Sequence, residues 1–176
     1  MNLSSKHFKM YSFSDKRQRL TGKAIHFILK RCAQCYRLTN SGGNIYSCTD
    51  LLGLRFNKIK KTVIFLNTHA HWLLLAIFPD RQCLIIDSLN LVRSWSDVMY
   101  AISLFCKNNN LQLFFLDTKF QRDNTQICGY LCLWATLKVS QLSFLNAFRL
   151  KEVISSNRPS TNERAMMYAV YKHYNL

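Results

Sequence analysis

The sequence predicts an α+β fold, in which a central mixed β-sheet is flanked by helices. Two kinds of pattern predict it. Short apolar runs of strand length recur in the middle of the chain, at residues 63–66, 71–78, 83–87 and 111–116, and segments of helical character lie around them, at 24–29, 95–105 and 128–139. With 176 residues, the chain is long enough for one domain with a real hydrophobic core.

The chain divides into a basic arm and a single domain. Residues 1–22 are polar, rich in Ser, Lys and Arg, and carry no hydrophobic period, so we expect a flexible basic arm followed by one folded domain over 23–176. The first apolar period, over 24–29, predicts a helix, and two glycines in 41–44 predict a loop before the strand at 63–66.

Two apolar runs in the middle of the chain predict a β-hairpin. Residues 71–78 and 83–87 are joined by a short turn that contains Pro79. A hairpin symmetric about Pro79 would place His71 directly opposite Asp87, within reach of a hydrogen bond. A slip of one residue would send the two side chains to opposite faces.

The second half of the chain predicts a surface helix, a strand and a buried helix. Ser94 with Asp97 resembles a capping box for a helix that Asn108 to Asn110 would stop, and a strand follows at 111–116. A polar loop then leads to Cys128, where an all-round apolar segment predicts a helix at the centre of the domain. A last helix is expected after residues 160–163.

Charge and hydropathy restrict the partners. Lys and Arg total 24 against nine Asp and Glu, giving +15, which favours polyanionic partners, nucleic acid before a membrane surface. The longest clean apolar run, 72–78, is too short to span a bilayer, and the N-terminus lacks the apolar core of a signal peptide. We therefore expect a soluble intracellular protein.

The seven cysteines are expected to be reduced thiols, because their number is odd and no export signal precedes them. Cys32 and Cys35 have the spacing of half a zinc site, but no second pair follows at a matching interval. His69 and His71 could also be a metal pair, yet Cys83 and Asp87 do not complete a tetrahedral set. We expect no metal.

Four residues together supply the groups of a cysteine hydrolase: Cys128, His71, Asp87 and Gln121. A thiol at a helix N-terminus beside an imidazolium is held as thiolate, a carboxylate orients the imidazole, and an amide N–H₂ stabilises an oxyanion. Gly129 would let a substrate backbone approach the thiol. Taken singly, each of these residues could have an ordinary structural role, and we expect Cys132 to be such a buried structural cysteine. Asp117 and Asp123 are alternative candidates for the acid that orients His71.

The pattern around these residues resembles the adenain family of adenovirus maturation proteases, in the clan of the SUMO-specific proteases. The resemblance rests on the segment that opens with His71-Trp72-Leu73, and on Pro79, Cys83 and Cys132. It rests also on the spacing Gln121-x-x-Asn124-x-x-x-Cys128-Gly129, in which Gln and Cys are seven residues apart. SUMO proteases usually have one residue fewer and an Asp where Ile127 stands. The resemblance is strong between residues 69 and 135.

This resemblance implies a papain-like or adenain-like fold and a set of roles. Cys128 is the nucleophile, His71 the general base and acid, Asp87 the orienting acid, and Gln121 with the Cys128 N–H the oxyanion hole. Trp72, Asn124 and Gly129 are expected to contact substrate. The implied function is cleavage of viral structural precursors at glycine-containing sites during virion maturation, by a monomer in the host nucleus and virion.

The implied activator is viral DNA, and no small-molecule cofactor is expected. The family also joins a short basic viral peptide through a cysteine at the position of Asn110, and Cys106 is the nearest thiol, so this partner stays open. Two other functions stay open as well. One is removal of ubiquitin-like modifiers, and the other is an inactive, basic, nucleic-acid-binding virion protein.

Overall fold

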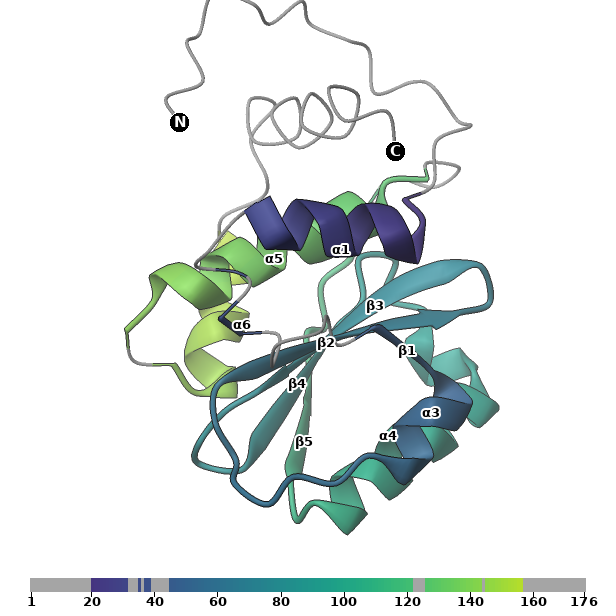
Figure 1. Ribbon diagram of the computed structural model, residues 1–176, viewed down its shortest axis with the longest axis vertical. Coiled ribbons are helices and arrows are strands. Elements are labelled where there is room, and N and C mark those ends of the chain that lie inside the picture. Colours follow the sequence, from purple (N-terminus) through teal and green to yellow (C-terminus); the bar gives the residue numbers. More distant parts are fainter. Residues whose placement is uncertain are drawn as a thin grey trace, which may run out of the picture.

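The computed structural model describes residues 20–31, 35, 37–38, 45–121, 126–143 and 145–156, and every structural statement below concerns these residues. Most of the predicted arm, the predicted loop at 41–44 and the helix expected after residue 160 lie outside them. Figure 1 shows the described part as a sheet with helices on both faces.

A five-stranded mixed sheet forms the centre of the molecule, in the strand order β1-β2-β3-β4-β5. The strands are β1 (Ile45–Ser47), β2 (Thr62–Thr68), β3 (His71–Ile77), β4 (Gln82–Ile86) and β5 (Gln112–Phe115). The inner three form an antiparallel meander, and each edge strand pairs in parallel with its neighbour. The predicted α+β fold with a mixed sheet is therefore confirmed.

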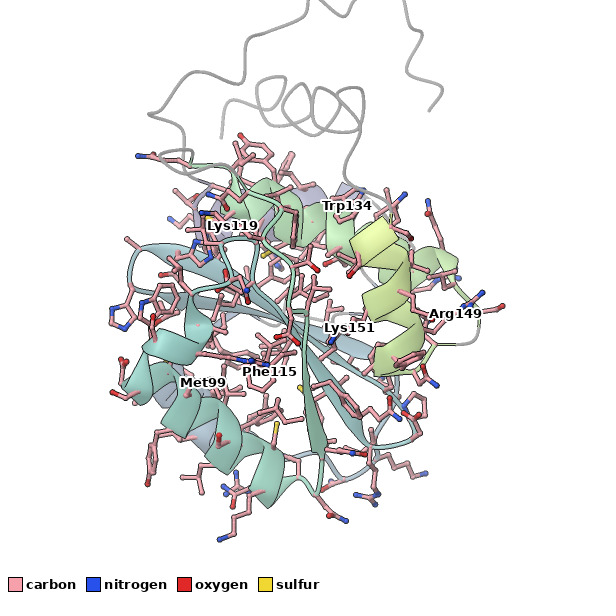
Figure 2. All side chains as sticks on the ribbon, turned by 180° about the vertical axis from the view of Figure 1, so that it is seen from behind. Met99, Phe115, Lys119, Trp134, Arg149 and Lys151 are labelled. Atoms are coloured by element: carbon pink, nitrogen blue, oxygen red, sulfur yellow. The ribbon has the colours of Figure 1, made fainter. Side chains whose placement is uncertain are left out.

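Helices cover the sheet in two layers (Figure 1). One layer contains α1 (Gly22–Arg31), α5 (Cys128–Gln141) and α6 (Ala147–Ser156), and the other contains α3 (Cys48–Gly53) and α4 (Ser96–Asn108). Seen from behind, Trp134 of α5 and Arg149 of α6 lie on one side of β5 and Met99 of α4 on the other (Figure 2). Each helix layer packs on its own face of the sheet and forms its own hydrophobic core.

The middle strand, β3, is buried along its whole length. Successive side chains of a strand point to opposite faces. Trp72, Leu74 and Ala76 accordingly enter the core beneath α5, whereas Leu73, Leu75 and Ile77 enter the core beneath α4. Fully burying one Leu side chain contributes about 1.5–3 kcal/mol, so both cores hold this strand in place. His71 is thereby the first residue of a strand that packs into both cores.

The predicted hairpin is confirmed, but its predicted register is wrong. Leu74 pairs with Ile86 and Ile77 with Cys83, and Phe78 closes the turn by donating its N–H to the Gln82 carbonyl. The turn is therefore centred on Asp80 rather than on Pro79. The last residue of the turn, Arg81, has a φ of 63°, which is a left-handed conformation. Because Gly or Asn usually occupies such a position, the sequence did not indicate it.

The predicted cap of α4 is also wrong. Ser94 belongs to a 3₁₀ turn, η2 (Val92–Ser94), and its hydroxyl donates to the Leu91 carbonyl. Asp97 pairs with His69 instead of reaching back to the helix start. The helix begins after Trp95 without a side-chain cap, since both capping groups have other partners.

Within the described residues, no helix combines the length and apolar character that a membrane crossing needs.

Candidate active site

A tight turn between β2 and β3 places His71. The two residues of the turn, His69 and Ala70, have φ values of 47° and 56°, and Thr68 pairs with His71 across the ladder. Positive φ at both central residues is the feature of a type I′ turn, which matches the twist of a two-stranded ribbon. His71 therefore leaves the turn as the first residue of the central strand.

The His71 side chain is joined to Asp87 by a buried hydrogen bond. Its Nε2 lies 2.8 Å from Oδ1 of Asp87, which follows the last residue of β4. His71 is 5 % exposed and Asp87 is 2 % exposed, so water competes little for this bond. The predicted contact is thus present. With the observed register extended, His71 would lie opposite Leu89, so it is a diagonal neighbour of Asp87 rather than its direct partner.

Backbone N–H groups hold the Asp87 carboxylate in place. Oδ1 also accepts from the N–H of Leu89 at 3.0 Å, and Oδ2 accepts from the N–H groups of Leu91 and Val92 at 2.6 and 2.8 Å. Burial alone would raise the pKa of Asp87, but the bond to His71 and these N–H groups lower it below the usual value. Asp87 is therefore a fixed anion behind the imidazole.

The thiol of Cys128 interacts with the same imidazole. Cys128 is the first residue of α5, as predicted, and its side chain is hydrogen-bonded to His71. The backbone N–H groups of Trp72 and Gly129 also favour its charged form. A sulfur at the positive end of a buried helix, with donors around it, is in the environment that stabilises a thiolate.

The two ionisable partners shift each other's pKa in opposite directions. Burial lowers the pKa of His71, but the hydrogen bonds to Asp87 and Cys128 outweigh it and raise the pKa to about 9. Burial raises the pKa of Cys128, and the bond and charge of His71 outweigh it and lower the pKa. These opposite shifts favour an imidazolium and thiolate pair over the neutral pair.

Gln121 lines the same cleft and belongs to the segment that follows β5. Figure 2 labels Lys119 in this segment. Gln121 is 3 % exposed, and its Oε1 accepts from the hydroxyl of Ser88. Asn124, expected to contact substrate, lies outside the described residues. The structure thus brings together the four side chains expected to do chemistry, while Ser88 was not anticipated, although it directly follows Asp87 in the sequence.

A cleft of about 240 Å³ opens at this point. Its lining contains His71, Gln121 and Cys128 together with His69, Ala70, Leu89, Leu91, Trp95 and Gln126. The Trp95 ring lies edge-on to the His71 ring at 5.7 Å and also faces His69 at 5.1 Å. In the sequence Trp95 resembled any apolar residue of an amphipathic helix, so nothing there indicated its position in the cleft.

Trp72 and Gly129, both expected to contact substrate, pack against Leu20. Trp72 is 4 % exposed, and its indole N–H donates to the carbonyl of Leu20 at 2.8 Å. A Cβ on Gly129 would come within 2.9 Å of the Leu20 Cβ and 3.2 Å of the Trp72 ring. Leu20 therefore fills the space above Gly129. The missing side chain of Gly129 permits this packing.

Other candidate groups are engaged elsewhere. Asp117 forms ion pairs with Arg93 and Lys151 at 2.7 and 3.2 Å, so it is not the partner of His71, and Asp123 lies outside the described residues. His69 pairs with Asp97 rather than sharing a ligand with His71. The described residues contain no group of three or more His, Cys, Asp or Glu that could hold a metal ion.

Two other cysteines, Cys132 and Cys106, are buried. Cys132 is buried one turn along α5, and its S–H donates to the Trp72 carbonyl at 3.4 Å. Burial raises the pKa of Cys132 well above its usual value, which leaves the thiol protonated. Cys106 is 3 % exposed and contacts Cys83, so it offers no accessible thiol for a disulfide-linked peptide.

Comparisons with known proteins identify the fold. No protein-family model matches the sequence, and no match is found among curated protein sequences. Among solved structures, the chain is similar to one described as the crystal structure of the de-sumoylating protease, with a TM-score of 0.55 and 14% sequence identity. The match covers 92% of this chain and 84% of the other. The chain therefore has the papain-like α+β fold of that protease.

Proposed function

We propose that this protein is a cysteine endopeptidase in which Cys128 is the nucleophile and His71 the general base and acid. The observation that supports it is one imidazole joined both to a buried carboxylate and to a thiol at a helix N-terminus, on the wall of a cleft. Asp87 orients the imidazole. Gln121 and the N–H of Cys128 form the oxyanion hole.

The first half-reaction forms a thioester. The Cys128 thiolate attacks the carbonyl carbon of the scissile amide, so a carbon–sulfur bond forms and the carbonyl oxygen becomes an oxyanion beside Gln121. The carbon–nitrogen bond then breaks, and His71 gives its proton to the departing amine. The hydrogen bond from His71 to Asp87 keeps the ring in one orientation throughout.

The second half-reaction restores the enzyme. His71, now neutral, takes a proton from water while the water oxygen attacks the thioester carbon. The carbon–sulfur bond breaks, releasing the new carboxylic acid, and sulfur leaves as thiolate beside the reprotonated imidazole. In each cycle His71 therefore gives one proton to the departing amine and regains one from water, while Cys128 attacks and leaves as thiolate.

The proposed substrates are viral structural precursors, cut at glycine-containing sites as particles mature in the host nucleus and virion. This assignment is supported by the resemblance of the segments around His71 and Cys128 to the adenain family. The high positive charge of the chain supports viral DNA as its activator or anchor. Binding to DNA should weaken steeply with added salt, because each neutralised phosphate releases counterions.

A second substrate class is supported by the structural comparison. The neighbour is described as a de-sumoylating protease, so a conjugate of a ubiquitin-like modifier is the alternative substrate. The chemistry at Cys128 would be the same, and the difference would lie in what binds the cleft.

The deciding experiment offers both substrate classes to one preparation. Peptides with internal glycine sites and fusions of ubiquitin-like modifiers are incubated with wild type, with Cys128→Ala and with Cys48→Ala, whose half-exposed thiol lies at the start of α3. Cleavage lost in Cys128→Ala and kept in Cys48→Ala supports a peptidase, and the preferred substrate names its class. If the native protein cleaves neither and a thiol-directed acyl probe never labels Cys128, the protein is an inactive nucleic-acid-binding relative.

A further inference from the structure

Ser88 makes three hydrogen bonds to the segment of Gln121, two of them to Gln121 itself and one to Phe120. Its hydroxyl donates to Oε1 of Gln121, and its carbonyl accepts from the backbone N–H groups of Phe120 and Gln121 at 3.0 and 2.9 Å. Both side chains are almost entirely buried, Ser88 being 1 % exposed and Gln121 3 % exposed. The conformation of Gln121 is therefore linked to the residue that follows Asp87.

The direction of the side-chain bond determines what Gln121 can do. An amide has an acceptor end and a donor end, and only its N–H₂ can stabilise a negative oxygen. Because the Ser88 hydroxyl donates to Oε1, the N–H₂ points the other way along the amide. A flipped amide would present its oxygen, which would repel an oxyanion.

The position of Ser88 links the two halves of the site. Asp87 is fixed to His71 and to three backbone N–H groups, so the chain at 87–88 has little freedom. Ser88, the next residue, is therefore also held in place, and its hydrogen bonds restrict Gln121 in turn. The end of β4 therefore positions both the His71 ring, through Asp87, and the Gln121 amide, through Ser88.

We infer that Ser88 is a positioning residue that sets the orientation of the Gln121 amide in the oxyanion hole. This inference rests on the proposed function and adds a residue to it. Ser88 itself does not touch the reacting atoms, because it acts through Gln121. Its removal should slow the chemical step while leaving substrate affinity and the pairing of Cys128 with His71 intact.

A double-mutant cycle tests this directly. Ser88→Ala should lower kcat by about tenfold or more with little change in KM, part of the loss of about 10²–10³ expected for removing an oxyanion donor. In a Gln121→Ala background the same change should alter kcat by less than about twofold, since the group through which Ser88 acts is gone. An equal loss in both backgrounds would overturn the inference, as would an unchanged kcat in Ser88→Ala.

The matched control removes a hydroxyl of the same kind elsewhere. Ser140 lies on α5, and its hydroxyl donates to the Leu137 carbonyl. Ser140→Ala should leave kcat and KM at wild-type values. Melting curves of all variants identify any that fail to fold. If Ser88→Ala does not fold, Ser88→Thr replaces it, and this variant should retain more than half of the wild-type kcat because it keeps the hydroxyl. A loss of kcat as large as that of Gln121→Ala would contradict the inference.

Two thiol reagents separate this inference from the proposed function. A peptide aldehyde adds to Cys128 and places an oxyanion in the hole, whereas iodoacetamide forms a carbon–sulfur bond with loss of iodide and needs no such donor. Ser88→Ala should bind the aldehyde about tenfold more weakly, yet its Cys128 should be alkylated within about twofold of the wild-type rate. Equal aldehyde affinity overturns the role of Ser88. Absence of any reaction at Cys128 in wild type overturns the proposed function instead.

Discussion

The imidazole of His71 and the carboxylate of Asp87 are diagonal neighbours on one face of the β3–β4 hairpin, joined by a buried bond of 2.8 Å. Asp87 has a second task at this position. Its two oxygens also accept hydrogen bonds from three backbone N–H groups in the turn that follows β4. One carboxylate therefore orients the imidazole and holds the chain that forms a wall of the cleft.

Asp87→Asn should damage both activity and stability. The amide cannot accept from all four donors, and its N–H₂ would face a backbone N–H or the imidazole. We expect kcat to fall about 10²–10⁴-fold through loss of ring orientation. Leaving buried donors unsatisfied should lower the free energy of unfolding by about 1–3 kcal/mol. Steady-state kinetics and urea denaturation measure the two effects.

Asp80→Asn is the control for this substitution, because Asp80 lies exposed in the turn between β3 and β4. It should change neither kcat nor stability appreciably. Loss of activity in Asp87→Asn without any loss of stability would show that the three backbone bonds do not depend on the charge.

The pH dependence of activity should differ from that of thiol alkylation. Activity needs Cys128 ionised and His71 protonated, so kcat/KM should rise as Cys128 ionises below its ordinary pKa and fall around pH 9 as His71 loses its proton. Alkylation needs only the thiolate and should not decline above pH 9. An alkaline limb near pH 6.5, the ordinary value for His, would contradict the paired arrangement.

Trp95 should affect the position of that alkaline limb. Its ring packs against His71, and burial is what lowers the His71 pKa. Trp95→Ala should admit water to the imidazolium, reduce this penalty and move the alkaline limb of kcat/KM to higher pH. Tyr100→Ala, an exposed aromatic on α4, should leave the limb in place. A shift to lower pH in Trp95→Ala would show that the ring stabilises the charged form instead.

The site could be predicted where it depends on local periodicity. His71 and Asp87 are 16 residues apart, so they lie on one face of the hairpin whenever the turn is centred on a residue rather than between two residues. The contact is therefore present although the turn is centred on Asp80 and not on Pro79. Likewise, the apolar run after Cys128 indicated a buried helix, and Cys128 is its first residue. Periodicity gives the face of a strand and the start of a helix with little need for tertiary information.

Contacts between distant segments could not be predicted in this way. Ser88 meets Gln121 across 33 residues, and Trp72 meets Leu20 across 52. The helices α3 and α6 and the strand β1 were also missed, since each is short or weakly periodic and is held by packing on the sheet. The turn at His69 and Ala70 adopts left-handed angles without the Asn-Gly signature that usually indicates them.

Gly129→Ala tests the packing that the structure places over the helix start. The new Cβ would lie 2.9 Å from the Leu20 Cβ and 3.2 Å from the Trp72 ring, closer than packed atoms tolerate. Because these neighbours are themselves buried, we expect a loss of about 1–3 kcal/mol in the free energy of unfolding, as for overpacked cores. Thermal and urea denaturation measure it.

Gly53→Ala provides the comparison, since a Cβ at Gly53, the last residue of α3, meets nothing within 4 Å. There the loss of unfolded-state freedom should stabilise the fold by about 0.4–1 kcal/mol. If Gly129→Ala did not lower the free energy of unfolding and also raised activity on large substrates, Leu20 would not fill this space in solution. The opposite signs expected for the two glycines follow from their surroundings, because Leu20 and Trp72 crowd Gly129 and no atom lies within 4 Å of a Cβ at Gly53.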